Sequence, residues 1–252
     1  MKIFIYHEQL GYGGVDTHLI HLINNWPNVE DEFFVLTNTD NQGRLALENE
    51  IIRPSSEVVD SNVSVFGFQK SSNFLFKIVR YSFACIKMQF VLWRKLFYTL
   101  PDVFVSNCGG YPGGLGNYLC LYTARFFVKR RFLLVHHAPT SFVVRSFIYS
   151  ITDFLIKFLP KSGFKTITVS SSSKFYLEKF TPLRDFLVID NGIDLSLKNP
   201  IKSTSSELAI DSLVIGMLGP VEPHKGIDFL IRCFASSDFL RSKAIISIVG
   251  SG

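Results

Sequence analysis

The segment Leu213–Asp228, which reads LVIGMLGPVEPHKGID, carries the pattern that decides the fold of this chain. Its apolar and β-branched beginning, Leu213–Leu218, predicts a buried parallel strand. Gly219 and Pro220 interrupt this strand, and a helix is expected over Gly226–Ala235. A strand that continues through a glycine-containing loop into a helix is the building unit of α/β folds with parallel sheets.

The same segment contains a candidate phosphate-binding loop. Backbone N–H groups at the start of the expected helix and the positive end of its dipole attract anions. Lys225 adds a cation to this loop, and Gly219 stands at the strand end. We therefore assign Gly219 and Lys225 to a candidate diphosphate site. The alternative is an ordinary strand–glycine–helix turn beside a solvated lysine.

Composition limits the classes of protein to consider. Of the 252 residues, 47% are hydrophobic and 19% are charged, which predicts a sizeable folded core. The net charge of +5 is too small to indicate nucleic-acid binding, but it favours anionic partners such as phosphates or an acidic membrane face. The four cysteines are scattered and form no metal-binding pattern, so we expect no metal site and a cytoplasmic protein. Neither a signal peptide nor a membrane span is expected.

Apolar runs alternate with helical patterns along the rest of the chain. Strands are expected at 2–6, 33–37, 63–68, 101–107, 130–135, 166–169, 186–189 and 244–249. Helices are expected at 15–25, 44–52, 73–100, 118–127, 142–159 and 174–180. This order predicts an α/β fold with parallel sheets and helices on both faces. It divides into a Rossmann-like domain (1–195), a polar linker (196–211) and the beginning of a second Rossmann-like domain (212–252).

The helix expected at 73–100 is unusual because it is apolar over most of its circumference. Its five cations fall on one arc of about 100°; they are Lys77, Arg80, Lys87, Arg94 and Lys95. One interpretation is a large half-buried helix with solvated cations. The other is a helix that rests on anionic lipid.

Further candidate residues lie where strands run into helices. Gly13 and Gly14 form a glycine loop after the first strand, either to admit a ligand or to make a tight turn. Glu8 lies just before this loop and is a candidate to orient a hydroxyl group. His136 and His137 end another strand, either as site residues or as histidines bonded to backbone.

Four motifs, in chain order, resemble those of a known family. They are the Gly13-Gly14 loop, VIDNGID at 188–194, IGMLGPVEPHKGID at 215–228 and ISIVGSG at 246–252. Together they are similar to motifs of glycosyltransferase family 4, the retaining enzymes of the GT-B fold with two facing Rossmann-like domains. The resemblance extends over the whole chain.

The resemblance implies roles for the candidate residues. Lys225, with Gly219, would bind the diphosphate of a nucleotide sugar, and Gly13 and Gly14 would approach the phosphate or the acceptor. His136 would lie near the reacting sugar, with His137 an equally placed rival. The chain departs from the family at two points. Pro220 stands in the place of an arginine, and the family's glutamate pair has no counterpart before the last residue of the sequence.

The predicted function is therefore sugar transfer, with retention, from a nucleotide-diphosphate sugar to a glycan or lipid-linked acceptor in cell-surface polysaccharide biosynthesis, such as lipopolysaccharide or capsule. The nucleotide sugar would be a co-substrate, and no cofactor is expected. The expected location is cytoplasmic, with peripheral association to the inner membrane face through residues 73–100. The alternative is a truncated, catalytically inactive Rossmann-like binding or partner module.

Overall fold

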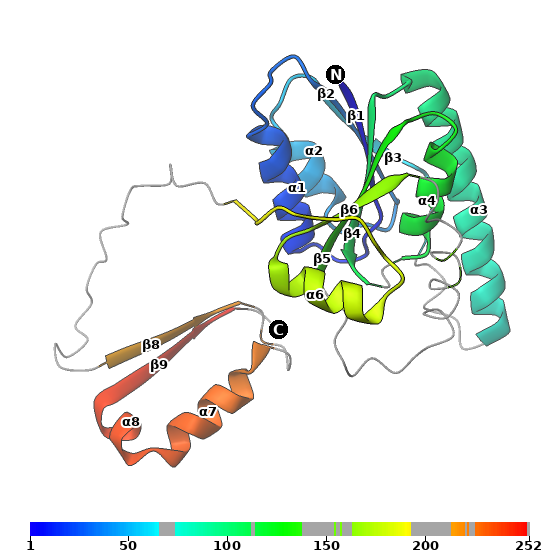
Figure 1. Ribbon diagram of the computed structural model, residues 1–252. Helices are drawn as coiled ribbons and strands as arrows, with labels where there is room; N and C mark the ends of the chain where they lie inside the picture. The colour runs from blue at the N-terminus through cyan, green and yellow to red at the C-terminus, as the bar shows by residue number, and fades with distance from the viewer. Residues whose placement is uncertain are drawn as a thin grey trace. The chain divides into compact units, whose positions relative to one another are not determined.

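The computed structural model describes residues 1–65, 74–111, 114–137, 154, 157, 163–192, 213–219, 221 and 225–250. The chain separates into two compact units, Met1–Ile193 and Asp194–Gly252. Each unit is described by itself (Figure 1).

The first unit is built on a seven-stranded sheet with the order β3-β2-β1-β4-β5-β6-β7. Every neighbouring pair of these strands is parallel. The strands are β1 (Lys2–His7), β2 (Glu32–Thr37), β3 (Ser56–Asp60), β4 (Val103–Gly110), β5 (Arg130–His137), β6 (Phe164–Thr168) and β7 (Phe186–Val188).

Helices cover both faces of this sheet (Figure 1). The helices of this unit are α1 (Gly14–Asn24), α2 (Arg44–Glu50), α3 (Phe74–Thr99), α4 (Gly116–Ala124) and α6 (Ser171–Phe180). α6 begins at a serine cap, in which the Ser170 hydroxyl accepts a hydrogen bond from the Ser173 N–H.

The alternation of side chains along β1 divides the core in two. Ile3 and Ile5 belong to the cluster that contains the apolar residues of α1 and α2. Phe4 and Tyr6 belong to the other cluster, which is formed with α3 and α4. The central strand is therefore buried on both faces.

The long helix α3 is half-buried. One side, with Met88, Leu92 and Leu96, is inaccessible to solvent and packs in the core. The opposite side carries large apolar residues that are exposed, among them Phe83 and Phe90. Of the two interpretations of residues 73–100, the packing on the core is thus confirmed, and the exposed side is considered below.

The second unit consists of β8 (Leu213–Leu218), α7 (Ile227–Ser236), α8 (Asp238–Lys243) and β9 (Ala244–Val249). β8 and β9 pair in parallel, as expected for a strand–helix–strand unit. Both strands end where the sequence predicts.

The predicted α/β fold with a parallel sheet is confirmed. The third strand, however, is Ser56–Asp60; of the strand predicted at 63–68, residues 63–65 do not join the sheet, and residues 66–68 lie outside the described residues. Val63 and Val65 are nevertheless buried against the α3 side of the core, which explains their apolar character. The short helix α8 was not predicted. The helix predicted at 142–159, apart from residues 154 and 157, and the linker predicted at 196–211 lie outside the described residues.

Among the residues described, no helix is both long and apolar enough to cross a membrane.

Truncation of a side chain to alanine should destabilise the protein on the buried side of α3 and have little effect on the exposed side. Leu92→Ala removes a fully buried side chain and should lower the free energy of unfolding by about 2–5 kcal/mol. Phe90→Ala removes a side chain that is 65% exposed and should change it by about 0.5 kcal/mol or less. Urea unfolding followed by circular dichroism measures both. Equal losses would contradict this orientation of the helix.

Candidate functional site

The strand order reverses at β1 and β4, and this reversal creates the candidate site. β2 and β3 lie on one side of β1, and the later strands lie beyond β4. The loops after β1 and β4 therefore lead to opposite faces of the sheet and leave a crevice at its carboxyl edge. A pocket of about 500 Å³ occupies this position.

The pocket is lined by glycine backbone together with polar and a few apolar side chains. Its lining residues come from the loop after β1, the start of α1, the region between β4 and α4, and the end of β5; they are Glu8, Gln9, Leu10, Gly11, Gly13, Gly14, Val15, Asp16, Gly109, Gly110, Gly114, Asn117 and His137. These described lining residues include two carboxylates and no lysine or arginine.

Gly13 and Gly14 are at the N-terminus of α1, as predicted. Gly13 is the N-cap residue and Gly14 the first helical residue. Among the described residues, the N–H groups of Gly14 and Val15 have no hydrogen-bond partner. The start of a helix leaves such N–H groups available to a ligand oxygen.

Glu8 is a buried carboxylic acid beside this pocket. Its side chain is 3% exposed, and its Oε2 accepts a hydrogen bond of 2.5 Å from the Tyr6 hydroxyl. A β-carbon at Gly114 or Gly116 would collide with the Glu8 carboxyl group, so both positions accommodate glycine alone without rearrangement. Burial raises the pKa of Glu8 to about 7; the Tyr6 hydrogen bond opposes this rise and the charge of Asp40 adds to it. Oε1 has no hydrogen-bond partner within the described part of the chain.

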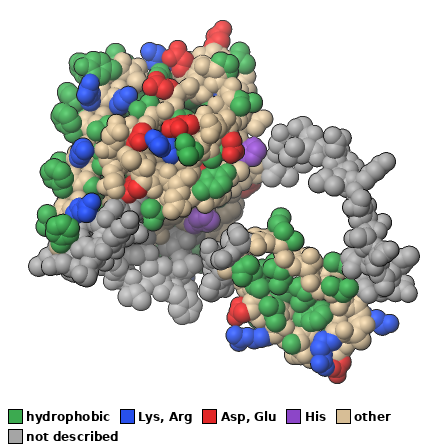
Figure 2. Space-filling model, turned by 180° about the vertical axis from the view of Figure 1, so that it is seen from behind, with side chains coloured by type: hydrophobic (Ala, Val, Ile, Leu, Met, Phe, Trp, Pro, Cys, Tyr) green, Lys and Arg blue, Asp and Glu red, His purple; other side chains and the backbone are tan. Residues whose placement is uncertain are grey.

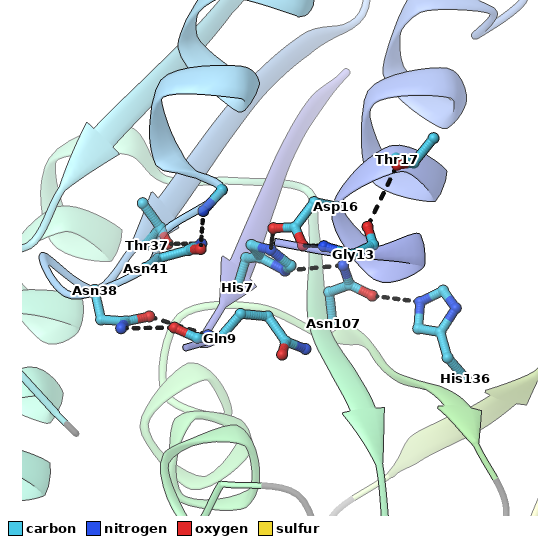
Figure 3. Close-up of polar contacts among 11 residues, drawn as sticks. His7, Gln9, Gly13, Asp16, Thr17, Thr37, Asn38, Asn41, Asn107 and His136 are labelled. Atoms are coloured by element: carbon cyan, nitrogen blue, oxygen red, sulfur yellow. Dashed lines mark hydrogen bonds and ion pairs between the residues drawn. The ribbon is translucent and has the colours of Figure 1, made fainter. Parts of the chain in front are cut away.

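A chain of buried polar side chains begins at Asp16, which lines the pocket, and ends at His136 (Figure 3). Asp16 accepts a hydrogen bond from the Gly13 N–H at 2.9 Å through Oδ2, and its Oδ1 lies 2.9 Å from His7 Nε2. The Asn107 amide lies between two imidazoles: its Nδ2 is 3.0 Å from His7 Nδ1, and its Oδ1 is 2.8 Å from His136 Nε2. His7 and Asn107 are register partners in β1 and β4, so sheet pairing brings them together.

The structure separates the two candidate histidines. They are consecutive in β5 and therefore point to opposite faces. His137 is exposed and lines the pocket, whereas His136 is 7% exposed and belongs to the buried chain. Burial lowers the pKa of His136 to about 3, with further contributions from His18, His137 and His7, so its imidazole is neutral at physiological pH.

The predicted phosphate loop lies in the second unit. Lys225 is exposed, and within the described residues it has no ion-pair or hydrogen-bond partner. It precedes Gly226, the N-cap of α7, which adopts a left-handed conformation with φ of 72°. The Gly219 N–H donates to the Val249 carbonyl at 3.0 Å, so this N–H continues the β8–β9 pairing.

Sequence reasoning did not identify His7 or Asn107. Each is a polar residue at the carboxyl end of an otherwise apolar strand, and this position was the available signal. No cluster of three or more metal-ligating side chains occurs in the described regions.

The raised pKa of Glu8 predicts a pH-dependent stability. The folded protein holds this proton up to about pH 7, whereas the unfolded chain releases it near pH 4.5. The stabilisation from this group is therefore complete below pH 4.5 and is lost as the pH rises to about 7. Glu8→Gln, which cannot ionise, should abolish this loss and raise the free energy of unfolding at pH 7.5 relative to the wild type by roughly 3 kcal/mol. Denaturant unfolding between pH 4.5 and 8 measures the difference, and parallel pH profiles would contradict it.

Comparison by sequence gives no match, either to a protein-family model or to a curated protein. Comparison by structure does. The lipopolysaccharide outer core galactosyltransferase WaaB, in its apo form, is 15% identical to this chain with a TM-score of 0.54, and the match covers 98% of this chain and 68% of WaaB. MurG from Acinetobacter baumannii is 12% identical with a TM-score of 0.54, over 99% of this chain and 66% of MurG.

A mutant of S. aureus TarM, in complex with fondaparinux, alpha-GlcNAc-glycerol and UDP, is 9% identical with a TM-score of 0.62. That match covers all of this chain (100%) and 72% of TarM. At such low identity these similarities concern the fold alone. The chain has an α/β fold of the type found in GT-B glycosyltransferases.

Proposed function

We propose that this chain belongs to a glycosyltransferase that moves a sugar from a nucleotide-diphosphate sugar to a glycan or lipid-linked acceptor, with retention at the anomeric carbon. The observation that carries the proposal is the glycine-lined pocket at the strand-order reversal of a GT-B-type sheet. Crevices at this position are where open α/β sheets bind their ligands.

We assign the nucleotide sugar to the second unit. Lys225 is an exposed cation without an ion-pair partner among the described residues, and it stands directly before the start of α7. A compact ammonium group and the first N–H groups of a helix stabilise a diphosphate and the negative charge that develops on it as it leaves. The Gly219 N–H is bonded to the Val249 carbonyl, so the proposed site rests on Lys225 and α7.

We assign the acceptor to the pocket of the first unit. Its lining of glycine backbone, amides, His137 and carboxylates suits a ligand rich in hydroxyl groups better than an anion. In a retaining reaction, the acceptor hydroxyl attacks on the face from which the diphosphate departs. The role of the protein is then to position the hydroxyl and stabilise the leaving group.

The lysine gives the first test of this function. Lys225→Ala should weaken the binding of UDP or GDP about 10- to 100-fold, because a hydrogen bond to a charged group contributes about 1.5–3 kcal/mol. Lys243→Ala, which removes another cation of the second unit at the end of α8, should leave binding unchanged. Isothermal titration calorimetry measures both constants.

Transfer is tested with UDP-glucose, UDP-galactose, UDP-N-acetylglucosamine and GDP-mannose, and NMR of the product gives its anomeric configuration. Inversion would overturn the retaining mechanism. Nucleotide binding without transfer or donor hydrolysis would favour the alternative of an inactive binding module. Absence of both from a folded protein would overturn the proposal.

We further propose that the exposed side of α3 rests on an anionic bilayer. Its apolar residues recur at spacings of three and four, and each is 46–69% exposed; they are Phe76, Val79, Phe83, Ile86, Phe90, Trp93 and Phe97. Arg80, Lys87 and Arg94 are exposed at seven-residue intervals beside them. Helix α3 contains no acidic residue. Figure 2 shows hydrophobic and basic side chains mingled on this edge of the first unit.

Aromatic stacking holds the exposed side chains of α3 in one ridge. The Trp93 ring stacks on Phe90 and Phe97, with centroid distances of 6.4 and 5.8 Å. Phe127 of the neighbouring segment contacts Trp93 edge to face and supports the ridge. An apolar ridge flanked by cations is the arrangement by which amphipathic helices lie at a lipid surface.

Charge reversal tests the membrane proposal. The triple change Arg80→Glu, Lys87→Glu and Arg94→Glu should weaken binding to vesicles of phosphatidylcholine with phosphatidylglycerol about 100-fold or more, since each cation contributes about 1 kcal/mol near an anionic surface. The matched control reverses three exposed cations on β5, β6 and the turn before β5: Lys129, Arg130 and Lys165. Vesicle flotation measures both. Equal binding of the two triple variants would overturn the proposal.

A further inference from the structure

The donor and acceptor roles along the buried polar chain are fixed from one end, because the Asp16 carboxylate at that end only accepts hydrogen bonds. An ionised carboxylate has no proton to donate. One oxygen of Asp16 is held by the Gly13 N–H, and the other faces His7 Nε2 at 2.9 Å. His7 must therefore carry a hydrogen on Nε2, and in the neutral ring Nδ1 is left as an acceptor.

The protonation of His7 then fixes the orientation of the Asn107 amide. The group that faces His7 Nδ1 must be a donor, and Asn107 presents its amide nitrogen there at 3.0 Å. The same amide consequently presents its oxygen to His136 Nε2 at 2.8 Å. A reversed amide would set two acceptors against each other at His7 Nδ1, and the amide oxygen at the other end requires a hydrogen on His136 Nε2. With all four side chains at most 7% exposed, water cannot readily replace these partners.

We propose that Asn107 is a positioning residue that, with His7 and Asp16, holds His136 as the neutral Nε2–H tautomer and leaves its Nδ1 as a hydrogen-bond acceptor. This assignment does not depend on the proposed function.

The chemistry of Nδ1 defines which ligand group it can bind. The rings of His18 and His136 pack edge to face with a centroid distance of 4.7 Å. A neutral imidazole that offers a lone pair attracts a hydroxyl hydrogen and repels phosphate oxygens. Burial keeps the ring neutral, since it lowers the pKa of His136. His136 is thus suited to recognise a sugar or polyol hydroxyl and not the diphosphate.

The tautomers can be measured without any substrate. In the full chain labelled with ¹⁵N-histidine, long-range ¹H–¹⁵N correlation spectra distinguish Nε2–H, Nδ1–H and cationic rings. His7→Phe and His136→Phe assign two of the six histidines by loss of signal. We expect both rings to be neutral Nε2–H tautomers at pH 7. A cationic His7, or an Nδ1–H His136, would overturn the proposal.

An isosteric change at the far end of the chain provides the sharper test. In Asp16→Asn, the Gly13 N–H still requires the side-chain oxygen, so the new NH₂ group faces His7 Nε2. His7 must then move its hydrogen to Nδ1, the Asn107 amide must reverse, and His136 must become the Nδ1–H tautomer. We expect this switch at His136, three hydrogen bonds away from the substituted atom. An unchanged His136 spectrum would overturn the proposal.

Removal of the Asn107 amide should abolish the preference of His136 for one tautomer. Asn107→Leu should give His136 the averaged signals of two tautomers, whereas Asn38→Leu, the same change at another fully buried asparagine that bonds Gln9 and Asp40, should leave His136 unchanged. Absence of transfer would count against the proposed function only. The tautomer measurement, which needs no substrate, would still test the positioning role of Asn107.

Discussion

The pairing of β1 with β4 is the constraint on which the rest of this structure depends. β1 is buried on both faces, with β2 and β3 on one side of it in the sheet and β4 to β7 on the other. The helices that follow β1 and β4 must then cover opposite faces, which opens the crevice between their first turns. The register that aligns Phe4 with Phe104 in the core also aligns His7 with Asn107 at the edge. Packing of the strand interiors and placement of the polar side chains are consequences of one pairing.

The sequence predicts the fold well wherever an apolar run ends at glycine or a polar residue. β8 and β9 are the clearest cases, since their β-branched runs match the observed bounds. The error at the third strand has a physical origin. Val63 and Val65 are buried by contact with α3, and an apolar pattern reports burial, not hydrogen bonding in a sheet. The true strand, SEVVD, is less apolar because no residue of β3 is fully buried.

The candidate site is predictable only in part, because its contacts join distant segments. Gly13 and Gly14 are recognisable from a glycine pair between a strand and a helix, a local signal. The choice between His136 and His137 depends on which face of β5 each side chain takes, and that follows from the whole sheet. The hydrogen bond between His7 and Asn107 spans 100 positions and has no local signature. Sequence reasoning thus locates the edge of the sheet but not the contacts across it.

The two units differ in the charged groups that they offer to a ligand. The pocket of the first unit is lined by glycines, two carboxylates, amides and the His137 imidazole, and its described lining residues include no lysine or arginine. Burial raises the pKa of Glu8, which lines the pocket, and lowers that of His136 in the buried polar chain, so both groups tend toward the uncharged form. The described loop of the second unit instead presents the exposed Lys225 beside a helix start. A diphosphate gains nothing from a pocket whose described lining holds two carboxylates and no cation, and a polyol gains little from a single solvated ammonium group. The division of substrates between the two units that we propose therefore follows from where the chain leaves charge exposed and where it removes it.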